Sequence, residues 1–242
     1  MKARVKFTKL GSMRFIGHLD VMRYFQKVIK LSGIDIAYSK GYSPHQQLSF
    51  ASPLGIGITS EGEYLDLELV SSDAPEQMIR RLNDCLNDEI RILDFVFLPD
   101  DCKNAMSQVS AADYLIWASE AEDPGLLEHF ADYVHRPSLP VVKTTKKSET
   151  TLDLTQYIYG FAAETRRPSM VPYPAGRTFY LQLAAGSEVN IKPDLLLAAY
   201  CADEGRDWHP ALVKTHRLEV RGTRGEEQIP LLAFGTHEPA GS

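Results

Sequence analysis

The sequence predicts an α+β protein made of two successive units with antiparallel sheets. Segments in which apolar and polar residues alternate, as in half-buried strands, are interleaved with segments in which apolar residues recur every three or four positions, as in helices. The chain has 242 residues, of which 44% are hydrophobic. It is therefore long for one compact domain and long enough to bury two cores.

The first predicted unit comprises residues 1–98. Residues 3–8 alternate as a strand, and residues 21–32 have the apolar spacing of a helix, with Asp20 as the expected N-cap and Gly33 as the expected stop. The following segments are predicted as strands at 34–38 and 47–50 on either side of a turn-rich loop, a strand at 64–70, a helix at 74–87 and a strand at 90–98. We interpret this succession as the β-α-β-β-α-β plan of ferredoxin-like folds.

The second predicted unit comprises residues 111–222, after a polar linker at 99–110. Its predicted elements are a strand at 114–118, a helix at 125–134, a hairpin of 141–145 and 150–154 around Lys146–Glu149, a strand at 180–183, a helix that opens at Pro193 and a strand at 212–220. A second ferredoxin-like unit is therefore expected, although residues 155–178, which include three prolines, follow no clear pattern. We expect residues 223–242 to form a disordered tail.

The charge is distributed unevenly along the chain. The net charge is −6, which argues against nonspecific binding to nucleic acid in bulk. Residues 1–60 nevertheless carry nine basic and two acidic side chains, a balance of +7, so the remaining residues carry −13. This asymmetry predicts a basic face that binds an anionic partner. The alternative is that these charges are solvated or paired within the fold.

Several functional classes lack their sequence signatures here. The three cysteines, Cys85, Cys102 and Cys201, are far apart, and no P-loop, dinucleotide-binding, HExxH or GxSxG pattern occurs. We therefore expect neither a metal nor a cofactor. No apolar run is long enough to cross a bilayer, and charges occupy the N-terminus where a signal peptide is apolar. A soluble, cytoplasmic protein without membrane contact is expected.

Two segments are candidates for a binding site. Residues 13–20 lead into the first helix, where free backbone N–H groups and the helix dipole attract phosphate, and His18 is placed to act as a general base or a hydrogen-bond donor. Residues 40–46 combine a lysine, a tyrosine and a histidine in a Gly/Pro turn, which suits phosphate contact and base stacking. The predicted RNA- or anion-binding residues are Lys9, Arg14, His18, Arg23, Lys27, Lys30, Lys40, Tyr42 and His45. In both segments a purely structural role is the alternative, and His18 is the one catalytic candidate.

An acidic cluster lies at Glu61, Glu63, Asp66 and Glu68. Metal binding is one interpretation of it. We favour a plainer one, in which Arg4 and Lys6 pair with Asp66 and Glu68 across the exposed face of neighbouring strands.

The first seventy residues also carry specific motifs, namely RFIGHLD at 14–20, AYSKGYSPH at 37–45, LSFA at 48–51, PLG at 53–55 and SEGEYLD at 60–66. They resemble an uncharacterised family found beside, or fused after, radical S-adenosylmethionine (radical-SAM) proteins. Asp153-Leu154 and IKPDLL at 191–196 resemble later segments of that family. The resemblance implies RNA processing or modification and a radical-SAM partner. The expected tandem fold and a histidine beside the first helix also resemble endoribonucleases that process CRISPR repeats, but the glycine-rich loop of those enzymes is not matched by Gly222-Thr223-Arg224-Gly225.

Three functional hypotheses follow from these observations. The first is a non-catalytic RNA-binding module or adaptor that presents RNA to a radical-SAM protein. The second is a metal-independent endoribonuclease that uses His18 as its base. The third is a protein–protein scaffold that binds no nucleic acid. Strong salt dependence of RNA binding favours the first two over the third, because phosphate contacts release counterions.

Overall fold

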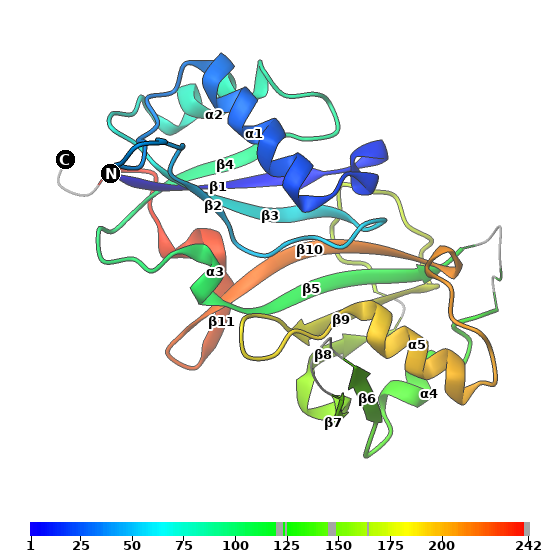
Figure 1. The fold of residues 1–242 in the computed structure, drawn as a ribbon. Helices are drawn as coiled ribbons and strands as arrows, with labels where there is room; N and C mark the ends of the chain where they lie inside the picture. The colour runs from blue at the N-terminus through cyan, green and yellow to red at the C-terminus, as the bar shows by residue number, and fades with distance from the viewer. Residues whose placement is uncertain (120–122, 124, 145–148, 164, 240–242) are drawn as a thin grey trace. The chain divides into compact units, whose positions relative to one another are not determined.

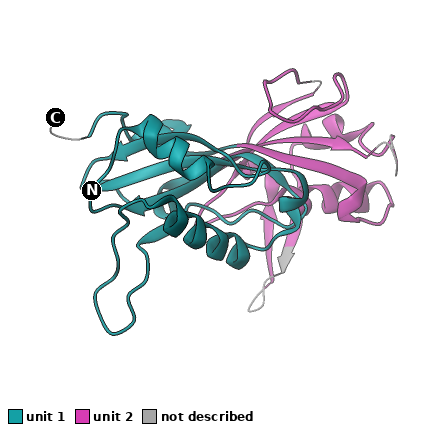
Figure 2. Cartoon of the chain, turned by 90° about the horizontal axis from the view of Figure 1, so that it is seen from above, with its two compact units in different colours: residues 1–110, 219–242 teal, residues 111–218 magenta. Residues whose placement is uncertain are grey.

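The protein is described by a computed structural model that covers residues 1–119, 123, 125–144, 149–163 and 165–239. Within these residues the chain is α+β, with five α-helices and mostly antiparallel sheet. Contacts divide it into two compact units (Figure 2). Unit 1 contains Met1–Ser110 and Glu219–Ser242, and unit 2 contains Ala111–Leu218.

Unit 1 contains the elements of the first predicted unit and the end of the chain. In chain order its elements are β1 (Lys2–Lys9), the 3-10 helix η1 (Gly11–Phe15), α1 (His18–Ser32), β2 (Leu48–Phe50), β3 (Thr59–Glu68), α2 (Pro75–Asn83), β4 (Ile92–Leu98), α3 (Ala105–Gln108), the last residues of β10 (Val213–Arg224), β11 (Glu227–Pro230) and η4 (Leu231–Phe234). The sheet has the order β4-β1-β3-β10, and β2 also pairs with β3. The predicted strand at 34–38 is replaced by single bridges at Ile36 and Tyr38.

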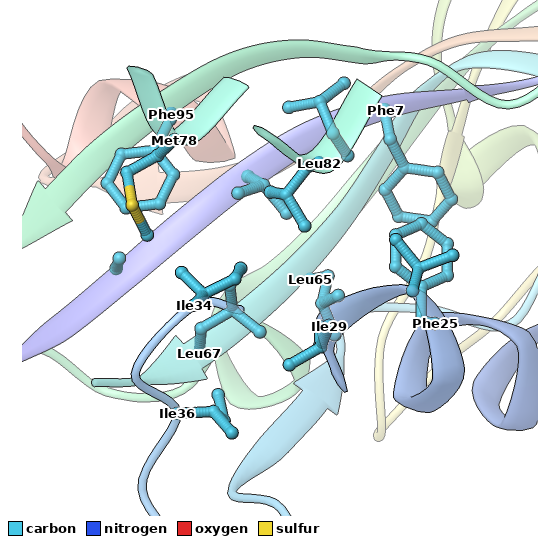
Figure 3. Close-up of a cluster of buried hydrophobic side chains, with 14 of the residues drawn as sticks. Phe7, Phe25, Ile29, Ile34, Ile36, Leu65, Leu67, Met78, Leu82 and Phe95 are labelled. Atoms are coloured by element: carbon cyan, nitrogen blue, oxygen red, sulfur yellow. The ribbon is translucent and has the colours of Figure 1, made fainter. Parts of the chain in front are cut away.

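The helices α1 and α2 cover one face of this sheet (Figure 1). Alternation along β1 turns Val5 and Phe7 toward them, where they join Leu65 and Leu67 of β3 in one apolar core (Figure 3). Gly33 ends α1 in the left-handed conformation, as predicted. The predicted N-cap is wrong, because α1 begins three residues earlier, after Gly17, and Asp20 lies within its first turn.

The other face of β1 carries charged side chains, of which Arg4 is buried and Lys6 half-buried. Arg4 is fully buried and donates two hydrogen bonds to Asp66, at 2.7 and 3.0 Å, which confirms that predicted pair. Lys6 pairs with Glu219 of β10 at 2.7 Å rather than with Glu68. The prediction of an exposed face was wrong, since Arg4 also donates to Leu231 O in η4.

The C-terminal segment also departs from prediction. Of the expected tail at 223–242, residues 227–234 form β11 and η4, and Leu231 is fully buried. The isolated sequence hides this because a short strand and a 3-10 turn become stable only through the neighbours that they cover. The predicted linker likewise contains α3, whose N-terminus is capped by Asn104.

Unit 2 contains the later strands and helices. In chain order its elements are β5 (Val109–Ala118), α4 (Phe130–Val134), β6 (Pro140–Thr144), β7 (Glu149–Asp153), the 3-10 helix η2 (Leu154–Tyr157), β8 (Ile158–Ala162), β9 (Thr178–Ala184), α5 (Pro193–Asp203), the 3-10 helix η3 (Pro210–Leu212) and the first residues of β10. The sheet order is β10-β5-β9-β8, and β6 and β7 form a separate hairpin. Residues 146–148 of its predicted turn lie outside the described residues. The strand β8 was not predicted, and it falls in the segment without a clear pattern.

Candidate nucleic-acid interface

The exposed side of α1 carries three cations. Arg23, Lys27 and Lys30 recur at i, i+4 and i+7, which places them on one side of a helix, and all three are exposed. Arg23 makes an exposed ion pair with Asp20 at 3.3 Å, a type of contact that contributes little. Lys27 and Lys30 make no ion pair in the described part of the chain. The stripe therefore presents positive charge to solvent, and its binding of an anionic partner stays a prediction.

The loop of residues 39–45 is attached to this helix at its base and carries an exposed tyrosine. Its ends are joined by a bridge between Tyr38 and Gln46, and Gln46 Nε2 donates to the carbonyl of Gln26 in α1 at 3.2 Å. Gly41 has φ 122°, a conformation that side chains disfavour, so a glycine suits this turn. The turn leaves Tyr42 fully exposed, two residues after the exposed Lys40.

Contacts within the loop join its two sides. Ser39 Oγ lies 2.8 Å from His45 Nδ1 and accepts a hydrogen bond from the His45 backbone N–H at 3.1 Å. The second predicted site histidine therefore holds the two sides of the loop together. Lys40, Tyr42 and the exposed ring of His45 remain as side chains that this loop offers to a ligand.

The turn before α1 is held in place by an acidic residue, Glu89, that was not predicted as a site residue. Glu89 accepts hydrogen bonds from Ser12 Oγ at 2.6 Å, Ser12 N at 2.9 Å and Met13 N at 3.0 Å. These donors hold the pKa of the Glu89 carboxyl below its ordinary value. The turn that they stabilise is η1, which carries Arg14.

Arg14 lies in this turn beside two exposed apolar side chains. The Arg14 guanidinium lies 4.6 Å from the centroid of the Phe15 ring, and Phe15 is 58% exposed. The carbonyl of Arg14 accepts a hydrogen bond from Gly57 N at 2.9 Å, next to the exposed Ile56. Phe15 was not among the predicted site residues, although it stands inside the motif at 14–20.

His18 is the first residue of α1. Its ring packs edge-on against Phe50, with 5.3 Å between centroids, and is partly exposed. Within the described residues, its ring nitrogens have no hydrogen-bond partner. A general base is normally oriented by a second group, so this arrangement lacks the coupling of a catalytic dyad. It leaves both nitrogens available to a ligand.

The remaining basic residues near the N-terminus are engaged inside unit 1. Lys9 is 3% exposed and donates to Ile16 O at 2.7 Å, so it secures the segment before α1 and is not exposed to a phosphate. Lys2 donates to the carbonyls of Asp100 and Cys102, and Arg4 and Lys6 are paired with carboxylates as described above. Four of the nine basic side chains in residues 1–60 are therefore engaged within unit 1, which narrows the predicted basic face to α1, η1 and the loop that bears Tyr42.

Among the described residues, no group of three or more His, Cys, Asp or Glu side chains is arranged to hold a metal ion. None of the helices in the same residues combines the length and apolarity that a membrane span requires.

Comparison with known proteins identifies the family. The family described as "Uncharacterized protein conserved in bacteria (DUF2344)" matches residues 2–193. The chain belongs to this family. The match extends from β1 to the first residue of α5, so both the α1 stripe and the Tyr42 loop lie within the family's span.

Solved structures and curated proteins add less. A chain of the "Crystal Structure of a Cbf5-Nop10-Gar1 Complex" is similar over 90% of this chain, with 8% sequence identity and a TM-score of 0.44. This chain covers 48% of the length of that one. The comparison with curated proteins gave no match.

Proposed function

We propose that this protein is an RNA-binding adaptor that acts with a radical-SAM protein in RNA modification or processing. The observation that carries the proposal is the exposed cationic stripe of α1 beside a loop with a fully exposed tyrosine. Cations at regular spacing suit successive phosphates, and an exposed ring suits a splayed base. RNA that is unpaired at the contact offers both groups together.

The adaptor role is supported by what surrounds His18. Cleavage of RNA needs a base, a proton donor for the leaving oxygen and a group that stabilises the phosphorane charge. His18 has no hydrogen-bonded partner in the described residues, and the His45 imidazole is engaged with Ser39. The radical-SAM partner is inferred from the motifs at 14–20 and 37–45, and we place the complex in the cytoplasm.

The fold that we propose for this adaptor is a tandem of ferredoxin-like units. In unit 1 the order β1-α1-β2-β3-α2-β4 and the strand neighbours β4-β1-β3-β2 support it. In unit 2 the same plan is supported if β5, α4, β8, β9, α5 and β10 are its elements and the β6-β7 hairpin is an insertion. In such a unit, helices cover one face of the sheet, which leaves α1 free to present its outer side.

The test is the salt dependence of RNA binding. A fluorescently labelled single-stranded RNA of mixed sequence is titrated with wild-type protein and with the triple variant Arg23→Gln, Lys27→Gln and Lys30→Gln. Each phosphate contact with single-stranded nucleic acid contributes about 0.7 to the slope of log K against log salt. Three contacts therefore account for about a 20-fold loss of affinity between 50 and 200 mM salt, and the variant should lack this component.

A matched variant controls for total charge. Arg80, Lys103 and Lys192 are also exposed and lie outside the stripe, so their replacement by glutamine removes the same charge. We expect this control to bind RNA with a slope close to that of wild type. If the two triple variants behave alike, or if wild-type protein binds no RNA at low salt, the proposal is wrong and the scaffold hypothesis takes its place.

A further inference from the structure

Unit 2 contains a hollow that the proposed function does not use. It lies where the end of β5 meets the segment that joins β8 to β9, and its volume is about 410 Å³. Two aromatic residues, Trp117 and Tyr173, form part of its lining together with Pro172, Pro174 and Lys214. The hollow therefore brings two aromatic rings and a cation together.

The two rings are held in place by their own elements. Trp117 stands on β5 opposite Thr178 of β9, and the centroids of the Trp117 and Tyr173 rings are 6.3 Å apart with 40° between their planes. The Tyr173 hydroxyl donates to Arg167 O at 2.5 Å, and a proline on each side restricts the backbone. Both rings are only partly buried, so part of their apolar surface stays open to the hollow.

The charge around the rings selects the ligand. Lys214 is exposed and makes no ion pair in the described residues. A second cavity of about 640 Å³ shares Ala118 and Pro174 with the first and is lined by Arg177, which is also exposed and without an ion pair in that part of the chain. Glu128 lines the second cavity but not the first. Free cations beside aromatic rings disfavour a cationic ligand and favour one that is planar, apolar on its faces and anionic.

We propose that this hollow binds a nucleoside monophosphate unit, with the base against Trp117 and Tyr173 and the phosphate at Lys214. The same chemistry is supplied by a free nucleotide or by an unpaired residue of single-stranded RNA. Arg177 is placed at the adjoining cavity to contact the next phosphate of a strand. In its RNA form the inference rests on the proposed function, whereas in its free-nucleotide form it stands alone.

The test uses the fluorescence of Trp117. The chain has two tryptophans, so Trp208→Phe leaves Trp117 as the only one. Full-length protein with this substitution is titrated with AMP, UMP, uridine and ribose 5-phosphate at low salt. We expect AMP and UMP to quench Trp117 saturably, uridine to quench it only at higher concentration because it lacks the phosphate, and ribose 5-phosphate to leave the fluorescence unchanged because it lacks the base.

Substitutions test the ring of Tyr173 apart from its hydroxyl, and the charge of Lys214 apart from the total charge of the protein. Tyr173→Leu should weaken AMP binding roughly 5- to 150-fold, the loss expected for one stacking contact, whereas Tyr173→Phe should retain it because the hydroxyl is used within the protein. Lys214→Gln should reduce the salt dependence of AMP binding, and Lys192→Gln, an exposed cation on the N-terminal side of α5, should not.

Competition with RNA distinguishes a free nucleotide from an RNA residue as the ligand, and the α1 variants distinguish this inference from the proposed function. If single-stranded RNA competes with AMP at Trp117 and an RNA duplex does not, the ligand is an unpaired RNA residue; if neither competes, it is a free nucleotide. If AMP and UMP cause no quenching while RNA binding through α1 remains, this inference fails and the proposed function stands. If quenching occurs but the α1 variants bind RNA as wild type does, the proposed function fails and the nucleotide site stands. Equal binding of ribose 5-phosphate and AMP would overturn the role of the rings.

Discussion

Replacing Arg4 by methionine should destabilise unit 1 strongly. Arg4 is fully buried on β1, and its guanidinium donates to both carboxylate oxygens of Asp66, to Gln108 Oε1 at 2.8 Å and to Leu231 O at 2.8 Å. Methionine fills much of the same volume and makes none of these bonds. The variant therefore leaves the Asp66 carboxylate, which is 14% exposed, with the Ala105 N–H as its one remaining hydrogen-bond donor in the described residues.

The magnitude follows from burial. Removing one partner of a buried ion pair costs about 3–5 kcal/mol, because the other charge stays desolvated. For a chain of this size, each kcal/mol lowers the melting temperature by about 2–4 °C, so the expected decrease is about 6–20 °C. Arg80, an exposed arginine on α2, is the matched control, and Arg80→Met should change the free energy of unfolding by less than about 0.5 kcal/mol.

Urea unfolding followed by circular dichroism measures the effect, and a double variant tests its cause. If the loss comes from the orphaned Asp66 carboxylate, Arg4→Met combined with Asp66→Leu should recover much of the stability, since an apolar pair can replace a buried ion pair at little cost. A double variant whose loss equals the sum of the two single losses would refute the reasoning, because it would mean that the two side chains act independently.

Two further predictions concern the site itself. His18→Ala should weaken RNA binding but leave RNA intact in both wild type and variant, which gel analysis of RNA incubated with purified protein without added metal will check; specific cleavage that disappears in the variant would instead favour the endoribonuclease. Glu89→Gln should destabilise the protein at neutral pH and progressively less below about pH 4.3. The pKa of Glu89 is lower in the folded protein than in the unfolded chain, so the ionised carboxyl stabilises the fold above the unfolded pKa, and this contribution is lost as the pH falls through the folded pKa. Melting curves from about pH 3 to 7, a range that spans the titration of a carboxyl group, measure the difference in stability, and a constant difference across that range would contradict the prediction.

Much of unit 1 could be predicted because its signals are local. Alternation fixed the inward side of β1, and Gly33 marked the end of α1. The cationic stripe followed from the helical period alone. The burial of Lys9 could not be predicted, since it depends on a carbonyl seven residues away that only the folded turn brings near.

Long-range contacts explain the other failures. Glu219 is more than two hundred residues from Lys6, and Leu231 is equally remote from Arg4, so no sequence window shows that the face of β1 is covered. The role of Glu89 could not be predicted for the same reason, since Glu89 is far in sequence from Ser12, in the turn that it stabilises. In unit 2, Tyr173 and Trp117 come from separate segments, and the proline-rich one gave no periodic signal.

The two proposed surfaces recognise RNA through two kinds of contact, which are positive charge and aromatic rings. Phosphate contacts give affinity and register without sequence information, whereas contacts to bases carry specificity. The α1 stripe offers only cations, so its share of the binding free energy should fall with salt and be indifferent to sequence. Tyr42 and the Trp117–Tyr173 pair offer ring faces, whose stacking persists in salt and varies with the base presented. An RNA preference that survives high salt would therefore belong to the rings, and it should vanish with the aromatic substitutions while the α1 variants leave it intact.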